Sequence, residues 1–113
     1  MMAVRTQSSP FGSATRTRVL IALWLLSESY PRELARVLRS PLSSIQKAMV
    51  GLERDGLIAA KIMGRTRVYR LEARYFAHAD LARYLRRLSE PEAELRGRVE
   101  ALRRRPRRTA KPL

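Results

Sequence analysis

Several residue types are scarce in this chain of 113 residues, and each scarcity excludes a class of protein. Cysteine does not occur, which excludes a disulfide framework and a thiolate metal site. Histidine occurs once, at His78, and with only Asp80 near it the sequence predicts no metal site and no cofactor. The longest apolar run, residues 19–26, spans 8 residues. A membrane-crossing helix needs about 20, so no transmembrane segment is expected and the protein is predicted to be cytoplasmic.

Acidic residues are also few, with 10 Asp and Glu against 24 Lys and Arg, so the formal net charge is +14. This excess of positive charge indicates a polyanionic partner, either nucleic acid or an anionic membrane. The length allows one domain and leaves little room for a catalytic cavity beside its core. The hydroxyls of Ser43 and Ser44 have no histidine in sequence reach, and no glycine-rich phosphate loop occurs. The chain is therefore not expected to be an enzyme.

Apolar spacing and capping residues predict three helices followed by a β-hairpin. Ser13 is a suitable N-cap for the first helix, and Ser40 with Pro41 repeats a start signal at the third, Ser40 as cap and Pro41 as first helical residue. Gly56 is expected to end that third helix. The expected elements are helices over residues 14–26, 31–39 and 41–55, and strands over residues 57–63 and 67–71 separated by a turn at 64–66.

The two ends of the chain and the segment after the hairpin have distinct patterns. Residues 1–12 lack an apolar period and are predicted to form a flexible arm, whereas residues 103–113 carry six cations and no acid and are predicted to be a basic disordered tail. The tail's charge serves either phosphate binding or solubility. Residues 72–102 carry a heptad-like apolar series, interrupted near Pro91, where a new helix starts or a long one kinks. That series is Leu81, Leu85, Leu88, Leu95, Val99 and Leu102.

The first predicted helix is apolar on every side in its second half, so it must be covered all round. In so small a protein, one side is expected to pack on its own domain and the other on a second copy of the chain. The apolar series in residues 72–102 supports the same homodimer, with packing on its own domain as the alternative. Trp24 and Tyr84 suit an interface or a core equally. The predicted interface residues are Leu20, Trp24, Leu81, Tyr84, Leu85, Leu88 and Leu95.

Three helices followed by a two-stranded hairpin is the element order of a winged helix-turn-helix. Residues 32–49, which read RELARVLRSPLSSIQKAM, resemble the helix-turn-helix of ArsR/MarR-like bacterial and archaeal regulators. Residues 51–58, GLERDGLI, resemble their passage from recognition helix to wing, and residues 64–71, GRTRVYRL, resemble the wing. The resemblance covers about residues 13–88 and implies a mainly α fold with a small β wing. It implies a three-helix core plus hairpin that binds DNA over residues 13–71, followed by C-terminal dimerisation helices.

The third helix and the hairpin carry the residues expected to contact DNA. At 100° per residue, the side of this helix opposite its apolar residues has no acid but has hydroxyls, an amide and a cation near its N-terminus, which suit base edges and phosphates. The predicted base-reading residues are Ser43, Ser44, Gln46, Lys47 and Val50. Residues 61–70 form the predicted wing, laid on the phosphate backbone or in the minor groove. The predicted backbone-contacting residues are Arg32, Arg36, Ser40, Arg54, Lys61, Arg65, Thr66 and Arg67.

The sequence therefore predicts a homodimeric, sequence-specific regulator of transcription that binds double-stranded DNA, and the resemblance implies repression. A dimer presents two recognition helices about 34 Å apart, one turn of DNA. One alternative is a winged-helix protein with a second protein as its partner, of an antitoxin-like or nucleotidyltransferase-associated kind. The other is a basic protein that binds nucleic acid or an anionic membrane without specificity. An uncovered apolar patch favours the protein partner, and binding that depends on charge alone favours non-specific binding.

Overall fold

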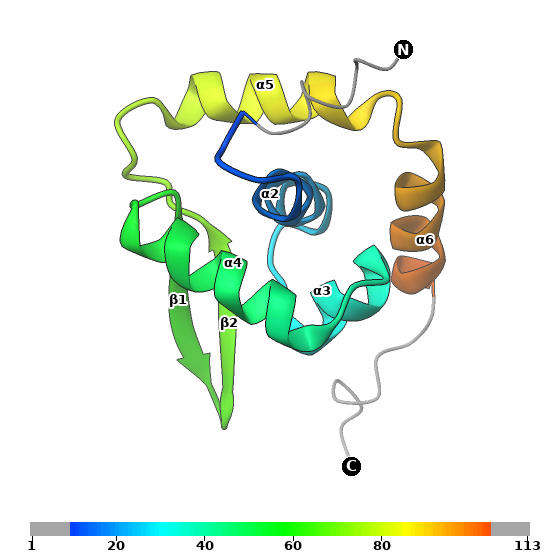
Figure 1. Ribbon diagram of the computed structural model, residues 1–113, viewed down its shortest axis with the longest axis horizontal. Helices are drawn as coiled ribbons and strands as arrows, with labels where there is room; N and C mark the ends of the chain where they lie inside the picture. The colour runs from blue at the N-terminus through cyan, green and yellow to red at the C-terminus, as the bar shows by residue number, and fades with distance from the viewer. Residues whose placement is uncertain (1–9, 105–113) are drawn as a thin grey trace.

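The computed structural model describes residues 10–104, which form five helices and a two-stranded antiparallel sheet (Figure 1). This is the mainly helical fold with a small β-hairpin that the sequence predicted, and it is compatible with a winged-helix-like arrangement. Residues 1–9 of the predicted arm and 105–113 of the predicted tail lie outside the described range. The helices are α2 (Ala14–Leu26), α3 (Pro31–Leu38), α4 (Leu42–Arg54), α5 (His78–Ser89) and α6 (Ala93–Arg104), and the strands are β1 (Ile58–Met63) and β2 (Thr66–Leu71).

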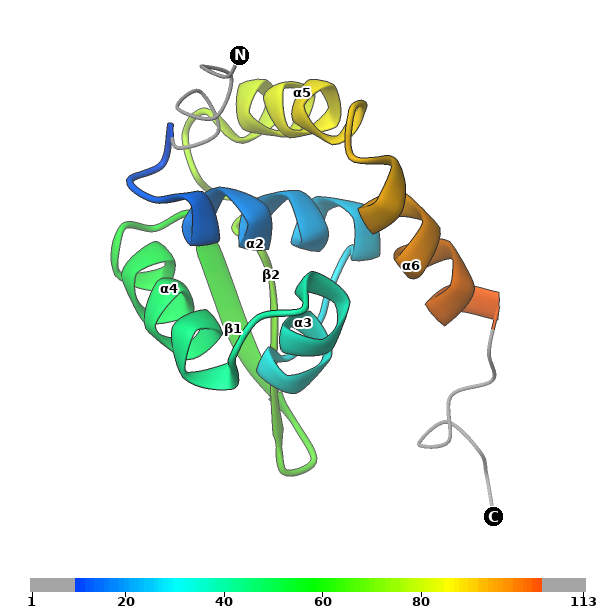
Figure 2. The ribbon, with the colours of Figure 1, turned by 45° about the vertical axis from the view of Figure 1, so that its right-hand side comes forward.

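Helix α2 lies at the centre of the molecule, with the other elements around it (Figures 1 and 2). It starts at the predicted cap, where the Ser13 hydroxyl accepts a hydrogen bond from the Arg16 amide at 3.1 Å. Val19, Leu20 and Leu23 are completely buried. Figure 2 shows α3 and α4 on one side of α2, α5 on the opposite side and α6 near its C-terminal end. The sequence predicted that α2 needs cover all round, and the chain itself covers most of it, leaving Trp24 and Leu25 half-buried.

The C-terminal helices turn their apolar seam toward α2. Leu20 of α2, Leu81 and Leu85 of α5, and Leu95 of α6 are all buried in the single chain, with Leu85 fully excluded from solvent. These four positions were predicted to form a dimer interface, but in the single chain they are buried against its own core, because α5 and α6 fold back over it. The alternative of packing on the chain's own domain is confirmed for this seam.

Two open points about residues 72–104 are resolved by the path of the backbone. Helix α5 ends at Ser89 and α6 begins at Ala93, with Pro91 in the turn between them, so the seam is carried by two helices and not by one kinked helix. Helix α6 continues to Arg104, so the first two residues of the predicted disordered tail are helical. At the other end, Phe11 of the predicted arm packs on Tyr84, with ring centroids 6.0 Å apart.

The turn between α3 and α4 has its own hydrogen bonds. Arg39 ends α3 in the left-handed region, with φ of 54°, and the Ser40 amide donates to the carbonyl of Ala35 at 3.0 Å. Helix α4 starts one residue later than predicted, because Pro41 is its N-cap residue and Leu42 its first helical residue. Ser40 does not cap α4, since its hydroxyl donates to the carbonyl of Leu38 at 3.2 Å and so stays within the turn.

The hairpin pairs Ile58 with Leu71 at its base and Met63 with Thr66 at its tip, which leaves a two-residue turn. Gly64 takes a φ of +68°, the conformation that such short turns require. Strand β2 therefore starts at Thr66, one residue earlier than predicted. A further backbone pairing was not predicted: the Ser29 amide donates to the Tyr69 carbonyl at 2.9 Å, and the Tyr69 amide to the Ser29 carbonyl at 2.7 Å. This bridge ties the hairpin to the segment between α2 and α3.

Candidate nucleic-acid interface

Helix α4 divides into a buried side and a solvent-facing side, as the sequence predicted. Ile45 and Leu52 are completely buried on the inner side, and Met49 is nearly so. The helix ends before Gly56, which takes the left-handed φ of +82° expected of a residue that closes a helix. The five residues predicted to read bases are all exposed on the outer side, namely Ser43, Ser44, Gln46, Lys47 and Val50.

The polar side chains on this outer side are free to meet a ligand. Within the described residues, no hydrogen bond or ion pair engages the side chains of Ser43, Ser44, Gln46 or Lys47. Val50, on the same side of the helix, has 63% of its surface exposed. Together these residues present hydroxyl, amide, ammonium and methyl groups on one surface without a carboxylate among them.

The Arg16 side chain of α2 lies across α4 at Gly51 and joins the two helices. The Arg16 guanidinium lies so close to Gly51 that an added Cβ would stand 2.0 Å from its Nη2 atom. The same guanidinium donates to the carboxylate of Asp55 at 3.2 Å and to the carbonyl of Phe11 at 3.2 Å. Glycine at 51 is therefore what allows an arginine from α2 to lie across α4 and fix its C-terminal half. The sequence analysis had not assigned a role to Arg16 or Gly51.

The hairpin is anchored to the end of α4 through Arg67. Its guanidinium pairs with the Glu53 carboxylate at 3.3 Å and donates from Nε to the Tyr69 phenolic oxygen at 3.1 Å. The hydrogen bond with Tyr69, and to a lesser extent the charge of Glu53, raises the pKa of Arg67, so this residue stays charged. Arg67 was predicted to contact the DNA backbone; it is exposed, and its guanidinium also joins the hairpin to the end of α4.

Other predicted backbone contacts divide into exposed and engaged residues. Ser40 is half-buried and engaged in the turn, where its hydroxyl also lies 3.5 Å from Arg18. Arg54 is exposed but has Asp55 at 3.6 Å, which reduces its local positive charge. The remaining predicted contacts are exposed, and no other described residue makes a side-chain hydrogen bond or ion pair with them. These are Arg32 and Arg36 on α3, and Lys61, Arg65 and Thr66 on the hairpin.

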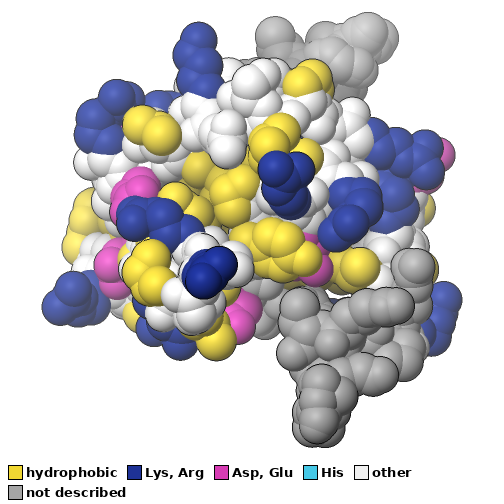
Figure 3. Space-filling model, turned by 90° about the horizontal axis from the view of Figure 1, so that it is seen from below, with side chains coloured by type: hydrophobic (Ala, Val, Ile, Leu, Met, Phe, Trp, Pro, Cys, Tyr) yellow, Lys and Arg dark blue, Asp and Glu magenta, His cyan; other side chains and the backbone are white. Residues whose placement is uncertain are grey.

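Two exposed cations of this surface were missed at the sequence level. Arg39 lies in the turn before α4, and Arg70 lies on β2. Both lie in sequence next to predicted contacts, Arg39 before Ser40 and Arg70 at the end of the predicted wing, and that position is the signal that could have found them. Figure 3, which views the molecule from the side toward which the hairpin points, shows lysine and arginine spread over this face, hydrophobic groups between them and fewer acidic groups.

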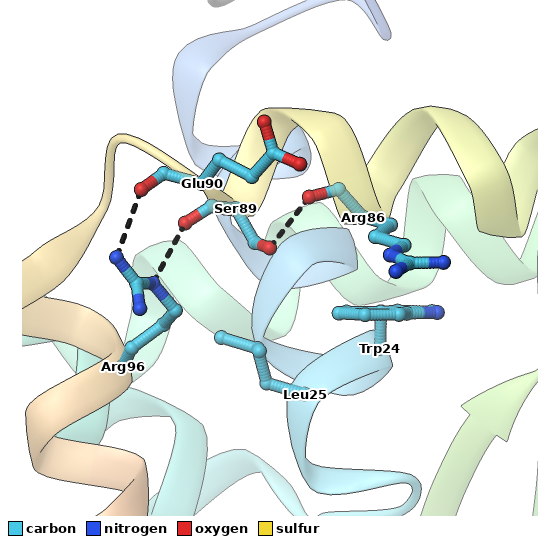
Figure 4. A pocket seen from close by; sticks show the side chains of 6 residues that line it. All are labelled: Trp24, Leu25, Arg86, Ser89, Glu90 and Arg96. Carbon is cyan, nitrogen blue, oxygen red and sulfur yellow. Dashed lines mark hydrogen bonds between the residues drawn. The ribbon is translucent and has the colours of Figure 1, made fainter.

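A hollow lies at the turn between α5 and α6 (Figure 4). It has a volume of about 280 Å³, below the usual range of ligand pockets, about 300 to 1,000 Å³. Arg96 closes one side by donating to the carbonyls of Ser89 and Glu90 at 3.1 and 2.9 Å. Figure 4 shows Arg86 lying over the ring of Trp24. The polar groups that line this hollow mainly join α6 to the end of α5, through the hydrogen bonds of Arg96.

Residues 10–104 contain no group of three or more His, Asp or Glu placed to hold a metal ion, and none of their helices is long and apolar enough to cross a membrane. No protein-family model matches the chain, and no curated protein matches it. The arrangement of α3, α4 and the hairpin is therefore the basis on which a function has to be assigned.

Proposed function

We propose that this chain binds double-stranded DNA as a winged helix-turn-helix protein, with α4 in the major groove and the hairpin on the adjoining backbone or minor groove. The observation that carries the proposal is the outer side of α4, where Ser43, Ser44, Gln46 and Lys47 are exposed and unengaged and no acid accompanies them. Base readout requires exposed polar side chains on a rigid helix. Side chains without intramolecular hydrogen bonds suit it, because no such bond has to break before they bind a base.

Each exposed group on α4 has a chemical counterpart in the major groove. The Gln46 amide can donate to and accept from adenine, and Lys47 suits guanine or a phosphate. Val50, with 63% of its surface exposed, suits the methyl group of thymine. The exposed arginines Arg32 and Arg36 on the preceding helix are suited to phosphates on either side of the groove.

The proposal includes a homodimer, located in the cytoplasm, that represses transcription by binding DNA. Two copies would read an inverted repeat with half-sites about 34 Å apart, and occupancy of that repeat would block the polymerase. Because four of the predicted interface leucines are buried in the single chain, the interface must use what remains accessible on α2 and α5. Tyr84 is 43% exposed, and Trp24 and Leu88 are half-buried, so these three are the residues that remain for the contact.

The experiment that tests this function is the selection of bound duplexes from a random DNA pool by the full-length protein at two salt concentrations. The test variant replaces Ser43, Ser44, Gln46 and Lys47 with alanine. The matched control is Arg87→Ala, which also removes one positive charge, but from the exposed side of α5. We expect an inverted repeat that survives the higher salt concentration, is kept by the control and is lost by the test variant. Salt-sensitive binding without a motif, equal for all three proteins, would contradict base readout.

A protein partner is the second candidate function, and one residue favours it. Phe76, in the segment between β2 and α5, has 92% of its surface exposed. Its ring lies 5.0 Å from that of Tyr75, so the two aromatic side chains offer an apolar contact outside α3, α4 and the hairpin. If the selection yields no motif, Phe76→Ser is the variant to compare in a search for a bound protein, and non-specific nucleic-acid binding is the remaining alternative.

A further inference from the structure

The tip of the hairpin carries two large apolar side chains in solvent. Ile62 has 63% of its surface exposed and Met63 has 48%, and they directly precede the turn formed by Gly64 and Arg65. Neighbouring residues of a strand point to opposite faces, so the tip carries an apolar side chain on each of its two faces. At the base of the same hairpin, by contrast, Ile58 is 2% exposed. The hairpin is thus apolar and buried at its base, and apolar and exposed at its tip.

The exposed pair is not covered by any other described part of the chain. The tip projects past α3 and α4 into solvent, as both ribbon views show (Figures 1 and 2). Positive charge surrounds it, since Lys61 and Arg65 are exposed and residues 58–71 contain no acid. A partner for this tip must therefore accept apolar groups at its centre and cations around them. The stacked bases of DNA between two phosphate backbones have this chemistry.

We propose that Ile62 and Met63 insert as a wedge between base pairs from the minor groove, so that this protein bends the DNA it binds. The inference rests on the proposed function and adds an activity to it. Apolar side chains inserted in this way partly unstack a base step and kink the duplex by about 20 to 90°. Arg65 and Lys61, which are exposed beside the apolar pair, can then neutralise phosphates next to the kinked step.

A wedge must be held rigidly, and the hairpin is joined to the rest of the chain at two places behind its tip, Glu53 of α4 and Ser29. Arg67, which pairs with Ile62 across the hairpin, is bound to Glu53 on α4 at 3.3 Å and to the Tyr69 hydroxyl at 3.1 Å. The backbone of Tyr69 is bridged to Ser29 by two hydrogen bonds. Insertion of the tip is therefore coupled to the position of α4. The preferred site has an easily unstacked step, such as TA or CA, beside the bases that α4 contacts.

The test measures the bend and the affinity in one titration. The probe is a duplex of roughly 30 base pairs with TA steps near its centre, labelled at both ends with a donor and an acceptor dye, together with a duplex carrying any recovered motif. The full-length protein is compared with Ile62→Ser/Met63→Ser. Phe76→Ser is the matched control, because it removes an exposed apolar side chain outside the hairpin. Arg65→Ala removes charge from the tip but leaves the apolar pair.

We expect the unmodified protein, Phe76→Ser and Arg65→Ala to shorten the end-to-end distance, with weaker binding for Arg65→Ala. The double serine variant should bind a straight duplex, and Ile62→Leu/Met63→Leu should restore the bend, which excludes a folding defect. A straight complex of the unmodified protein, or an equal bend with the serine variant, overturns the wedge and leaves DNA binding standing. The absence of binding to every duplex overturns both proposals.

An anionic membrane is the other surface with apolar and negatively charged groups, and the same variants distinguish it. Vesicles containing phosphatidylserine are sedimented with the unmodified protein and with the double serine variant. Vesicle binding that depends on Ile62 and Met63, together with an unchanged DNA bend, overturns the wedge in favour of a membrane contact. Loss of the DNA bend with equal, weak vesicle binding by both proteins supports the wedge.

Discussion

Both sides of α2 contain ion pairs, with Arg54 and Arg67 paired on the side of α4 and the hairpin, but the two sides differ in the exposed lysines that stay unpaired. On the side formed by α5 and α6, Arg83, Arg87 and Arg98 pair with acids on their own helices or in the turn that follows. On the side formed by α4 and the hairpin, Lys47 and Lys61 are exposed and make no ion pair with a described residue. The comparison teaches that a net charge of +14 does not by itself locate an interface, because only unpaired cations offer their charge to a partner.

The cations of α6 also stabilise the fold itself. Arg96 donates to carbonyls at the end of α5, Arg98 to the Val37 carbonyl of α3 at 2.6 Å, and Arg103 to the Leu25 carbonyl of α2. Carbonyls at helix C-termini lack intrahelical donors, and the helix dipole favours a cation there. Arg18 of α2 has the same role at the Leu38 carbonyl, at 3.0 Å. Helix α6 therefore braces three other helices, and its arginines are structural.

The largest expected effect is a loss of stability from a substitution at Leu85, on the α5 side of α2. Leu85→Ala opens a cavity at a fully buried position, so we expect unfolding free energy to fall by about 2 to 5 kcal/mol. Leu85→Met conserves volume and should cost less than about 1.5 kcal/mol. Urea unfolding at two protein concentrations measures both. If the loss from Leu85→Ala depended on concentration, Leu85 would lie between two copies, and its burial within one chain would not explain its role.

The next effect is a loss of base preference from a substitution at Gln46, on the outer side of α4. Gln46→Ala should leave stability unchanged, because the side chain makes no described contact, and should remove preference at one base pair of the site by about 1 to 3 kcal/mol. Binding titrations against the recovered site and its single-base variants measure this preference. An equal loss of affinity for every variant and for random duplexes would contradict base readout by Gln46.

A third effect tests the contact between Arg16 of α2 and Gly51 of α4. Gly51→Ala removes the conformational cost of a mid-helix glycine, which is worth about 1 kcal/mol. In the unmodified chain the new methyl displaces the Arg16 guanidinium from Asp55 and Phe11, so we expect that gain to be cancelled. In an Arg16→Ala background the same substitution should stabilise by about 1 kcal/mol. Thermal unfolding of the four proteins forms the cycle, and equal effects in both backgrounds would show that the two residues are not coupled.

The smallest effect compares one cation from each side. Arg65→Ala removes an unpaired cation at the hairpin tip, so the slope of log K against log salt concentration should become shallower by about 0.9. Arg87→Ala removes a cation that is paired with Glu90 at 3.6 Å on the far side of the core, and should leave the slope unchanged. Fluorescence anisotropy at four salt concentrations gives both slopes. Equal changes would mean that the basic charge of the whole molecule, and not one face, attracts DNA.

Much of the fold was predictable because its signals are local. The Ser13 cap, the Gly56 helix end and the buried spacing of Ile45, Met49 and Leu52 are confirmed, since each depends on backbone preferences or on helical period over a few residues. The start of α4 was predicted one residue too early. Serine at position 40 is typical of an N-cap. Its hydroxyl instead donates a hydrogen bond to the Leu38 carbonyl, which the turn brings within 3.2 Å.

The candidate site was predictable in part. The outer side of α4 follows from the helical period alone, and all five predicted base-reading residues are exposed. The engagement of Arg67 with Glu53 was not predictable, because the two residues lie 14 positions apart and meet only when the hairpin folds against α4. The bridge between Ser29 and Tyr69 was missed for the same reason, since a single pair of residues leaves no periodic pattern in the sequence.

Local sequence patterns account for which residues form helices and strands, for the apolar side of α4, and for the need to enclose the apolar helix α2. Those properties follow from local backbone preferences and from the periods of helices and strands. Only the tertiary structure decided what encloses α2. Leu20, Leu81, Leu85 and Leu95 have the same pattern whether they pack within a chain or between two. The direction of the turn at residues 90–92, which brings α6 back across the core, made the choice.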